Sequence, residues 1–319
     1  MQKKQEAIAW EARWAIPVAT ATFMAVVLMV ASGLVSAASG EGDAEILRSI
    51  HAHEGSVVLS GVLQGIGFAL LAVPLVYLFR VVRARSDGVR PQLIGLVIIA
   101  PIFLGLAAGV TAGARNEAGN QFVAGEAKST LSAKEAKEKC VSDRKDEGAK
   151  DFAGKYEPGA GETALAACED RKIEDDEASN AIAEASLASL ASGLGIAGGL
   201  GLVVALFYSC LWAMRTGILT RFWASLGMAL GVAALLGLIL FTLLWFIYFG
   251  LLVLGRVPGG RPPAWAAGEA IPWPTPGEKA AAELEPADPE VAESPSTDNG
   301  DGGDSSDDGG ERRKRKRRD

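Results

Sequence analysis

The stretch SVVLSGVLQGIGFALLAVPLVYLF, residues 56–79, decides the fold class of this chain. It contains no Asp, Glu, Lys, Arg or His. A helix of about 20 apolar residues crosses the roughly 30 Å hydrocarbon layer of a membrane, whereas the buried helices of soluble proteins seldom carry an apolar run of that length. We therefore expect residues 56–79 to form a transmembrane helix.

Similar apolar runs occur on both sides of this stretch, so the sequence predicts an all-α, polytopic bundle of transmembrane helices. The expected segments are a cytoplasmic N-terminus at 1–14, spans at 15–38, 56–79, 92–114 and 188–214, loops at 39–55, 80–91, 115–187 and 215–221, an apolar stretch at 222–255 and a disordered tail at 256–319.

The apolar stretch 222–255 has an unusual length. As one helix it would be about 50 Å long, too long for the hydrocarbon layer even when tilted. As two helices it needs a turn near Gly237–Thr242, where Thr242 is the one polar residue and unpaired backbone groups are costly in lipid. We favour two short spans, and hence six in total; one long span, and hence five, is the alternative.

The placement of Lys and Arg predicts the orientation, because basic residues in short loops stay in the cytoplasm. They cluster in 1–14, 80–91 and 215–221, whereas the loop 39–55 holds Arg48 alone. The N-terminus is therefore expected in the cytoplasm and the loop 115–187 outside it. The run 15–38 also fits a cleaved signal peptide, but it is longer than a typical signal core of about 7–15 residues, so an uncleaved span is favoured.

No Asp, Glu, Lys or Arg lies inside the predicted spans, unlike in most transporters and pumps. The most polar residue there is Gln64, for which a contact between helices is favoured over a substrate site. Tyr77 and Tyr208 are the other candidates for a polar path.

Glycines at four-residue spacing occur in the spans and are typical of closely packed membrane helices. Packing within one chain is favoured over a homodimer seam. The residues are Gly61, Gly65, Gly105, Gly109, Gly113, Gly195, Gly199, Gly227 and Gly231.

His51, His53 and Glu54 stand together before residues 56–79. Two imidazoles and a carboxylate can contribute to a zinc or copper site, but such sites need three or four ligands held in a fixed geometry. We favour a solvated loop and treat the metal site as a weak alternative.

The loop 115–187 has too few apolar residues for an independent core. Ser132 and Glu135 have capping-box spacing at the start of the helical sequence LSAKEAKEKC, and ETALAACEDRK follows after a turn. Each stretch carries one cysteine, Cys140 and Cys168. The oxidising environment outside the cytoplasm favours a disulfide between them over two free thiols.

The tail ends in seven basic residues after an acidic tract. Nucleic-acid binding is disfavoured, because no aromatic or structured element accompanies them. If the tail is cytoplasmic, we expect this basic tip to contact anionic lipid headgroups. Its residues are Arg312, Arg313, Lys314, Arg315, Lys316, Arg317 and Arg318.

The stretches GVLQGIGFALLAVPLVYLFR (61–80), FWASLGMALG (222–231) and GGRPPAW (259–265) carry a resemblance. The layout resembles multi-span bacterial membrane proteins of Gly- and Ala-rich composition. The resemblance covers the spans alone and implies a bacterial plasma membrane location without a specific activity.

No Ser/His, Cys/His, phosphate-loop or clustered-carboxylate arrangement is present, so we expect no enzyme and no cofactor. The sequence favours a non-enzymatic scaffold or interaction component of the cell envelope, in contact with the bilayer and with another membrane protein or a second copy. The alternative is a transporter or channel-like protein for a small or apolar solute.

Overall fold

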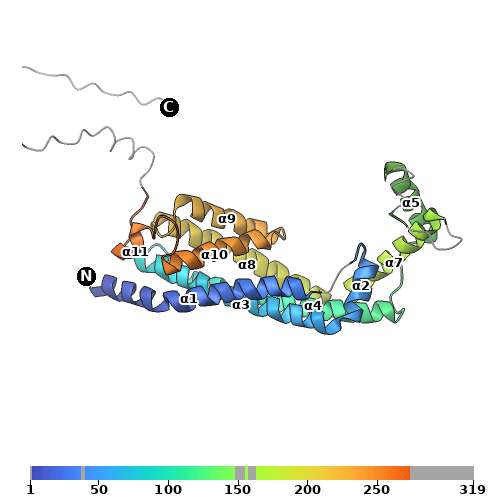
Figure 1. Ribbon diagram of the computed structural model, residues 1–319, viewed down its shortest axis with the longest axis horizontal. Helices are drawn as coiled ribbons and strands as arrows, with labels where there is room; N and C mark the ends of the chain where they lie inside the picture. The colour runs from blue at the N-terminus through green and yellow to red at the C-terminus, as the bar shows by residue number, and fades with distance from the viewer. Residues whose placement is uncertain (1, 37–39, 148–154, 157–162, 274–319) are drawn as a thin grey trace, which may run out of the picture. The chain divides into compact units, whose positions relative to one another are not determined.

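The computed structural model describes residues 2–36, 40–147, 155–156 and 163–273. Within these ranges all regular secondary structure is helical, which confirms the predicted all-α class (Figure 1). Residues 274–319, with the basic tip from Arg312 to Arg318, lie outside the described residues.

In the part of the chain that the structure describes, four helices are long and apolar enough to cross a membrane, and they correspond to the spans predicted before residue 222. They are α1 (Gln2–Val35), α3 (Glu54–Arg85), α4 (Ile94–Val123) and α8 (Ala188–Arg215), with the 3-10 helix η1 (Pro91–Leu93) leading into α4. Three of them extend well beyond the predicted spans: α1 begins before residue 15, α3 ends after 79 and α4 ends after 114. The apolar run marks the part that fits the membrane, whereas polar helix-forming residues continue the helix beyond it.

Six apolar helices contact one another in the closed circuit α1, α3, α4, α8, α9, α10 and back to α1, where α9 is Arg221–Leu235 and α10 is Ile239–Leu254. Their inward faces form the main core, which includes Leu71, Leu206 and Phe246. We call the end where α1 begins and α3, α8 and α10 finish the proximal end. The distal end is where α1 and α4 finish and α3 and α8 begin (Figure 1).

The stretch 222–255 forms a hairpin of two helices, so the alternative of one long helix is wrong. The amides of Leu236, Gly237 and Leu238 donate to carbonyls in the last turn of α9, and Gly237 adopts the left-handed conformation with φ of 85°. This is the usual glycine ending of a helix. The turn therefore pairs these amides without polar side chains, which is why the sequence shows no polar turn there.

Residues 256–273 pack against the proximal end, so the prediction of a disordered tail from 256 onward is wrong for this part. They include the short helix α11 (Pro263–Ala267), in which Ala264 and Trp265 are buried. Trp265 and Trp273 donate their indole N–H groups to the carbonyls of Ile218 and Leu219 in the α8–α9 loop. The aromatic anchors supply the apolar area that the Pro- and Gly-rich sequence otherwise lacks.

Among the described residues, three further helices stand at the distal end: α2 (Asp43–Ala52), α5 (Ala133–Glu147) and α7 (Ala164–Glu184). We call them the distal module. The helix α2 occupies most of the segment 39–55, for which the sequence predicts a simple loop. A separate core joins α2 and α7 to the end of α4, with Leu47, Ile50, Ala118 and Ala178 almost fully buried.

Candidate functional site

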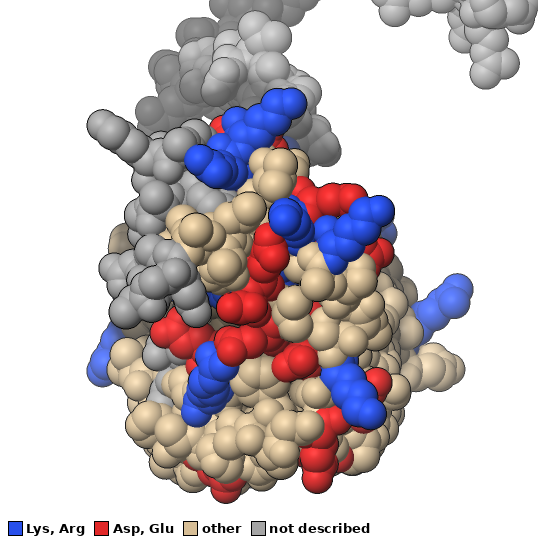
Figure 2. All heavy atoms as spheres, turned by 90° about the vertical axis from the view of Figure 1, so that its right-hand side faces the viewer, with Lys and Arg blue, Asp and Glu red and all other residues tan. Residues whose placement is uncertain are grey.

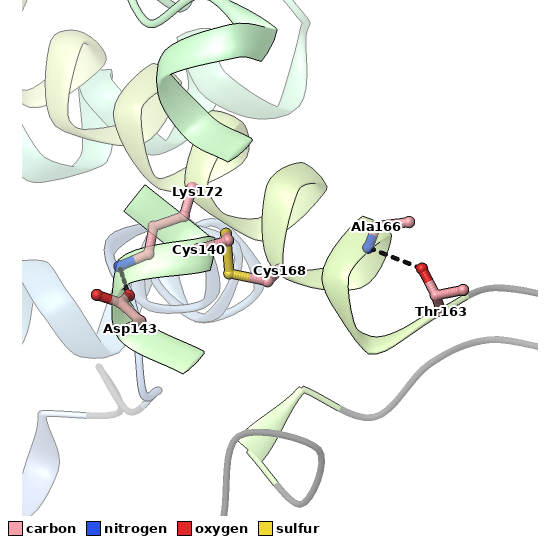
Figure 3. Close-up of a disulfide and its surroundings, with 6 residues drawn as sticks. All are labelled: Cys140, Asp143, Thr163, Ala166, Cys168 and Lys172. Carbon is pink, nitrogen blue, oxygen red and sulfur yellow. Dashed lines mark hydrogen bonds and ion pairs between the residues drawn. A yellow bond between two sulfur atoms is a disulfide. The ribbon is translucent and has the colours of Figure 1, made fainter. Parts of the chain in front are cut away.

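The hairpin of α5 and α7 is cross-linked by a Cys140–Cys168 disulfide whose Cα atoms are 6.0 Å apart (Figure 3). Both cysteines are fully buried, with Tyr156 packed beside them. An ion pair of 3.0 Å between Lys172 Nζ and Asp143 Oδ2 joins the same two helices. This small core agrees with the expectation that the loop lacks apolar material, because the covalent bond replaces packing.

Side chains cap both helices of the hairpin. Glu135 Oε2 accepts hydrogen bonds from the amide and hydroxyl of Ser132, and the Glu135 amide donates to Ser132 Oγ. This is the predicted capping box, and these hydrogen bonds lower the pKa of Glu135. Thr163 Oγ1 accepts from the Ala166 amide at the start of α7 (Figure 3). The caps define where the two helices begin.

The acidic run Glu174–Asp175–Asp176 on α7 organises the distal module. Glu174 pairs with Arg48 of α2 at 2.8 Å, and Asp175 accepts from the amide of Ala44 at the start of α2. Asp176 Oδ2 accepts from the Ser129 hydroxyl and from the Thr130 and Leu131 amides, which lowers its pKa. A run that looks like a solvated charged face therefore attaches α7 to two other segments. Sequence spacing offered no signal for these partners.

Charges of both signs cover the distal end. Figure 2 shows acidic side chains gathered across the middle of this face with Lys and Arg around them. Among the ion pairs of the distal module, Arg171 Nη2 lies 4.0 Å from Glu41 Oε2 and 3.9 Å from Glu45 Oε2. Some of the charges of the distal module are therefore paired.

The histidines lie at the end of α2 and are partly solvated. His51 Nδ1 is 2.7 Å from Asn120 Oδ1 and 3.6 Å from Glu54 Oε1, and His53 Nδ1 is 3.0 Å from the Ser49 carbonyl oxygen. Among the described residues, no group of three or more His, Cys, Asp or Glu could hold a metal ion. His51 therefore links α2 to the end of α4, and the His53 side chain stays close to the α2 backbone just before α3 begins.

A cavity of about 330 Å³ lies between α3, α4 and α8 below the distal module. Its polar lining includes Gln64 from α3 and Thr111 and Arg115 from α4. Val57, Phe68, Leu104, Ala108 and Gly195 are among its apolar walls. The structure thus places Gln64, the most polar residue of the predicted spans, beside this cavity, and its side chain has no hydrogen bond to another described residue.

Two predicted glycines pack tightly just below Gln64. A Cβ on Gly65 would stand 2.8 Å from the Gly105 carbonyl oxygen, and one on Gly105 would stand 2.5 Å from that of Gly65. Because both neighbours are backbone atoms, a side chain at either position would force the helices apart. The α3–α4 seam is therefore closed at this level.

The remaining predicted glycines divide into two groups. Gly61 packs on Ala112, Gly199 on Leu235, Gly227 on Cys210 and Trp245, and Gly231 on Leu206, all within the chain. A Cβ on Gly109 or Gly195 would meet no atom within 4 Å, and one on Gly113 would meet only Leu187, at 3.6 Å. The stripe 105–109–113 is thus not a continuous seam within the chain.

A buried ion pair between Glu11 of α1 and Arg85 of α3 dominates the proximal end. Arg85 Nη2 is 2.9 Å from Glu11 Oε2, and the side chains of Arg85 and Glu11 are 0% and 6% exposed. Arg85 also donates to the carbonyls of Val81 and Ala264, and its guanidinium lies 5.8 Å from the centre of the Trp265 ring. The pair therefore joins α1, α3 and the segment after α10.

Sequence reasoning missed this pair because Arg85 is one of several arginines in the loop 80–91. A usable signal was present: Arg85 follows Val81 and Tyr77 at four-residue intervals, so the helical repeat places all three on the buried face. Its partner on α1 could not be identified from the sequence.

Tyr77 and Tyr208 do not line a path with Gln64. The Tyr77 hydroxyl donates to the Glu11 carbonyl, and the Tyr208 hydroxyl accepts from the Arg90 amide, both at the proximal end. The structure therefore does not bring these three side chains together at one cavity, since the hydroxyls of both tyrosines make hydrogen bonds at the proximal end.

Comparison with known proteins finds no protein-family model, curated protein or solved structure that matches the chain.

Proposed function

We propose that the chain is a non-enzymatic scaffold or interaction component of the bacterial plasma membrane that presents the distal module outside the cytoplasm. The observation that carries the proposal is the exposure of α5. Along this helix Ala136 and Cys140 are buried against α7, whereas most of the other side chains face solvent. A helix held by a disulfide and exposed on its remaining faces suits recognition by a partner.

The orientation rests on two independent features. Lys and Arg are concentrated in the short proximal loops, which favours a cytoplasmic proximal end and N-terminus. The disulfide lies in the distal module, and disulfides persist in oxidising compartments outside the cytoplasm. A reporter fused after Asp319 tests this, because an extracytoplasmic signal would overturn the orientation of the tail.

We infer that α9 and α10 form a re-entrant hairpin in place of the fifth and sixth spans that the sequence favours. Each helix is about 22–24 Å long, shorter than the hydrocarbon layer. Leu235 at its tip packs on Gly199, which lies about 16 Å from the distal start of α8. The tip exposes Leu236, Leu240 and Phe241, which suits lipid and not water.

Labelling tests this inference. Leu236→Cys should resist a membrane-impermeant maleimide added to either face of the membrane, whereas Lys137→Cys on α5 should react from outside. Rapid labelling of Leu236→Cys from outside would restore the six-span arrangement. Both arrangements return the chain to the proximal side at residue 256.

The scaffold itself is tested by photo-crosslinking in intact cells that express the full chain. A photoreactive amino acid at Lys137 or Glu138, both exposed on α5, should give discrete adducts with a specific envelope protein. The matched position is Asp87, exposed in the α3–η1 loop, which should not give these adducts. Identical adducts from all three positions, or none from α5, would contradict the proposal.

We also propose that the tail binds a cytoplasmic partner and that its basic tip contacts anionic lipids. A deletion of the tail that tests these two proposals should begin at Pro274, because residues 256–273 pack against the bundle and their removal would damage the fold. Loss of vesicle binding or of a co-purified partner on this deletion supports the role. Unchanged binding would contradict a role of the tail in contacting lipids or a partner.

Solute transport is the second candidate, favoured by the polar cavity at Gln64. Substrate-dependent uptake into vesicles that disappears in Gln64→Leu would support it. A homodimer through the exposed Gly109 remains the proposal for a second copy, and oligomeric state in mild detergent tests it.

A further inference from the structure

The cavity at the distal end has donors without acceptors. In the described part of the chain, no hydrogen bond or ion pair involves the side chains of Gln64, Thr111 or Arg115, although all three line the cavity. Gln64 and Thr111 are half-buried and Arg115 is exposed, and an amide left unpaired at membrane depth is costly. Water or a solute therefore has to satisfy these groups.

The three residues are arranged in depth along the cavity. Arg115 lies just beyond the predicted span 92–114, and Thr111 lies one helical turn deeper on the same face of α4. Gln64 lies ten residues into α3, about 15 Å from its first residue, Glu54. The tight contact between Gly65 and Gly105 lies next to it. A solute entering from the distal end would thus meet Arg115 first and Gln64 last.

The lining favours a negatively charged group. Arg115 is its one charged residue, and neither Asp nor Glu contributes to the lining. A guanidinium offers five N–H donors and binds carboxylates in a planar, two-bond geometry, while a hydroxyl and an amide add donors. The site is therefore complementary to an anion that needs several donors.

The size and walls limit the rest of the ligand. A volume of about 330 Å³ is at the lower end of the roughly 300–1,000 Å³ typical of small-molecule sites. Val57, Phe68 and Leu104 suit a short carbon skeleton. Gln64 can both donate and accept, so it suits a second polar group at the far end of the solute.

We propose that this cavity binds a small organic carboxylate, with Arg115 holding the carboxylate, Thr111 adding a hydrogen bond and Gln64 contacting the opposite end. The inference goes beyond the scaffold role, because binding requires neither a protein partner nor passage across the membrane. The expected use is sensing or sequestering a solute from the distal side.

The test measures binding of carboxylates of two to six carbons to the full chain in nanodiscs, by calorimetry, with the corresponding uncharged amides as the comparison. At least one carboxylate should bind, and its amide should bind at least about tenfold more weakly. Arg115→Gln should weaken carboxylate binding at least about tenfold, and Gln64→Glu, which brings a negative charge into the cavity, should abolish it. Arg83→Gln, an exposed arginine at the proximal end, should leave it unchanged.

Three results would overturn the proposal. One is the absence of binding by every carboxylate to the unmodified chain. Another is binding that Arg115→Gln and Gln64→Glu leave intact while circular dichroism shows both variants folded. The third is native mass spectrometry in which a retained phospholipid, lost in Arg115→Gln, occupies the site while no carboxylate binds; the anion would then be a lipid phosphate.

Discussion

The two ends of the bundle hold their helices together in opposite ways. At the proximal end, Glu11 and Arg85 pair inside a closed cluster with Trp265, and the chain after α10 covers them. At the distal end, Asp175 and Asp176 make their hydrogen bonds near the surface, and a cavity with unpaired donors lies below. The proximal end is therefore closed by a buried ion pair, whereas the cavity at the distal end is lined by side-chain donors that have no hydrogen-bond partner among the described residues.

The difference has an energetic basis. A buried charge that loses its partner is very costly, so the proximal end tolerates little change. Exposed carboxylates are solvated even when their partners are lost, so the distal end can vary at a small cost. This asymmetry suggests that binding and recognition are concentrated at the distal end, and four variants test the contrast between the two ends.

The largest effect is expected from Glu11→Gln. It leaves the Arg85 guanidinium buried without a counter-charge, which typically costs about 3–5 kcal/mol. We expect a large fall in the thermal unfolding midpoint in detergent, followed by near-UV circular dichroism, and weaker docking of Trp265, followed by its fluorescence.

The matched control is Glu6→Gln, an exposed glutamate on the same helix, which should change stability little. The double variant Glu11→Leu with Arg85→Met should recover much of the loss, because it removes both buried charges. Equal midpoints for Glu11→Gln and Glu6→Gln would remove the contrast between the two ends.

The second effect is local to the distal end. Replacing Cys140 and Cys168 by Ser removes a cross-link over 28 residues, which the chain-entropy model values at roughly 3–4 kcal/mol. Hydrogen exchange should show α5 losing protection, while the midpoint of the bundle stays unchanged. Cys210→Ala, at the buried free cysteine, should leave α5 protected. Full protection of α5 without the disulfide would show that packing alone holds it.

The third effect lies between the two ends, at the closed α3–α4 seam. In Gly105→Ala the new Cβ would stand 2.5 Å from the Gly65 carbonyl oxygen, and overpacking of this kind costs about 1–3 kcal/mol. Gly109→Ala, one turn along, meets no atom within 4 Å and should be neutral or slightly stabilising. Unfolding of both variants in mixed micelles measures the difference. A similar cost at both positions would point to a contact of Gly109 with a second copy.

The sequence predicts the four long apolar helices of the described chain well, because an apolar run is a local property that one segment carries by itself. The Cys140–Cys168 pairing was also foreseeable, since the loop holds two cysteines and little else to stabilise it. The Glu11–Arg85 pair and the partners of Asp175 and Asp176 were not. Glu11 and Arg85 are 74 residues apart, and Asp176 is 45–47 residues from its partners in the loop before α5. The helical repeat places Arg85, unlike Arg83, on the buried face of α3, but nothing local identifies its partner, and nothing local distinguishes Asp176 from Asp170.

The packed segment 256–273 is a second case in which contacts between distant segments could not be predicted from the sequence. Its Pro and Gly content is typical of an irregular chain, yet Trp265 and Trp273 reach carbonyls that only the folded α8–α9 loop presents. The cavity was hidden for a related reason: Gln64 lies in a span whichever way it faces, and only the packing of α4 and α8 leaves space beside it.

The smallest effect is a pH dependence of the distal module. Hydrogen bonds from Ser129, Thr130 and Leu131 lower the pKa of Asp176 below its ordinary value of 3.8, so the folded chain binds this proton more weakly than the unfolded chain does. The stabilisation is therefore complete above about pH 4 and is lost as the pH falls through the lowered pKa.

In Asp176→Asn the α4–α5 loop should be loosened at every pH, and the Thr130 and Leu131 amide resonances should no longer titrate with this group. Asp170→Asn, at an exposed carboxylate six residues earlier on α7, should leave that titration in place. If both amides titrate unchanged in Asp176→Asn, a group other than Asp176 controls the loop. The carboxylates near the surface of the distal end would then contribute less to its structure than the contrast with the buried Glu11–Arg85 pair assumes.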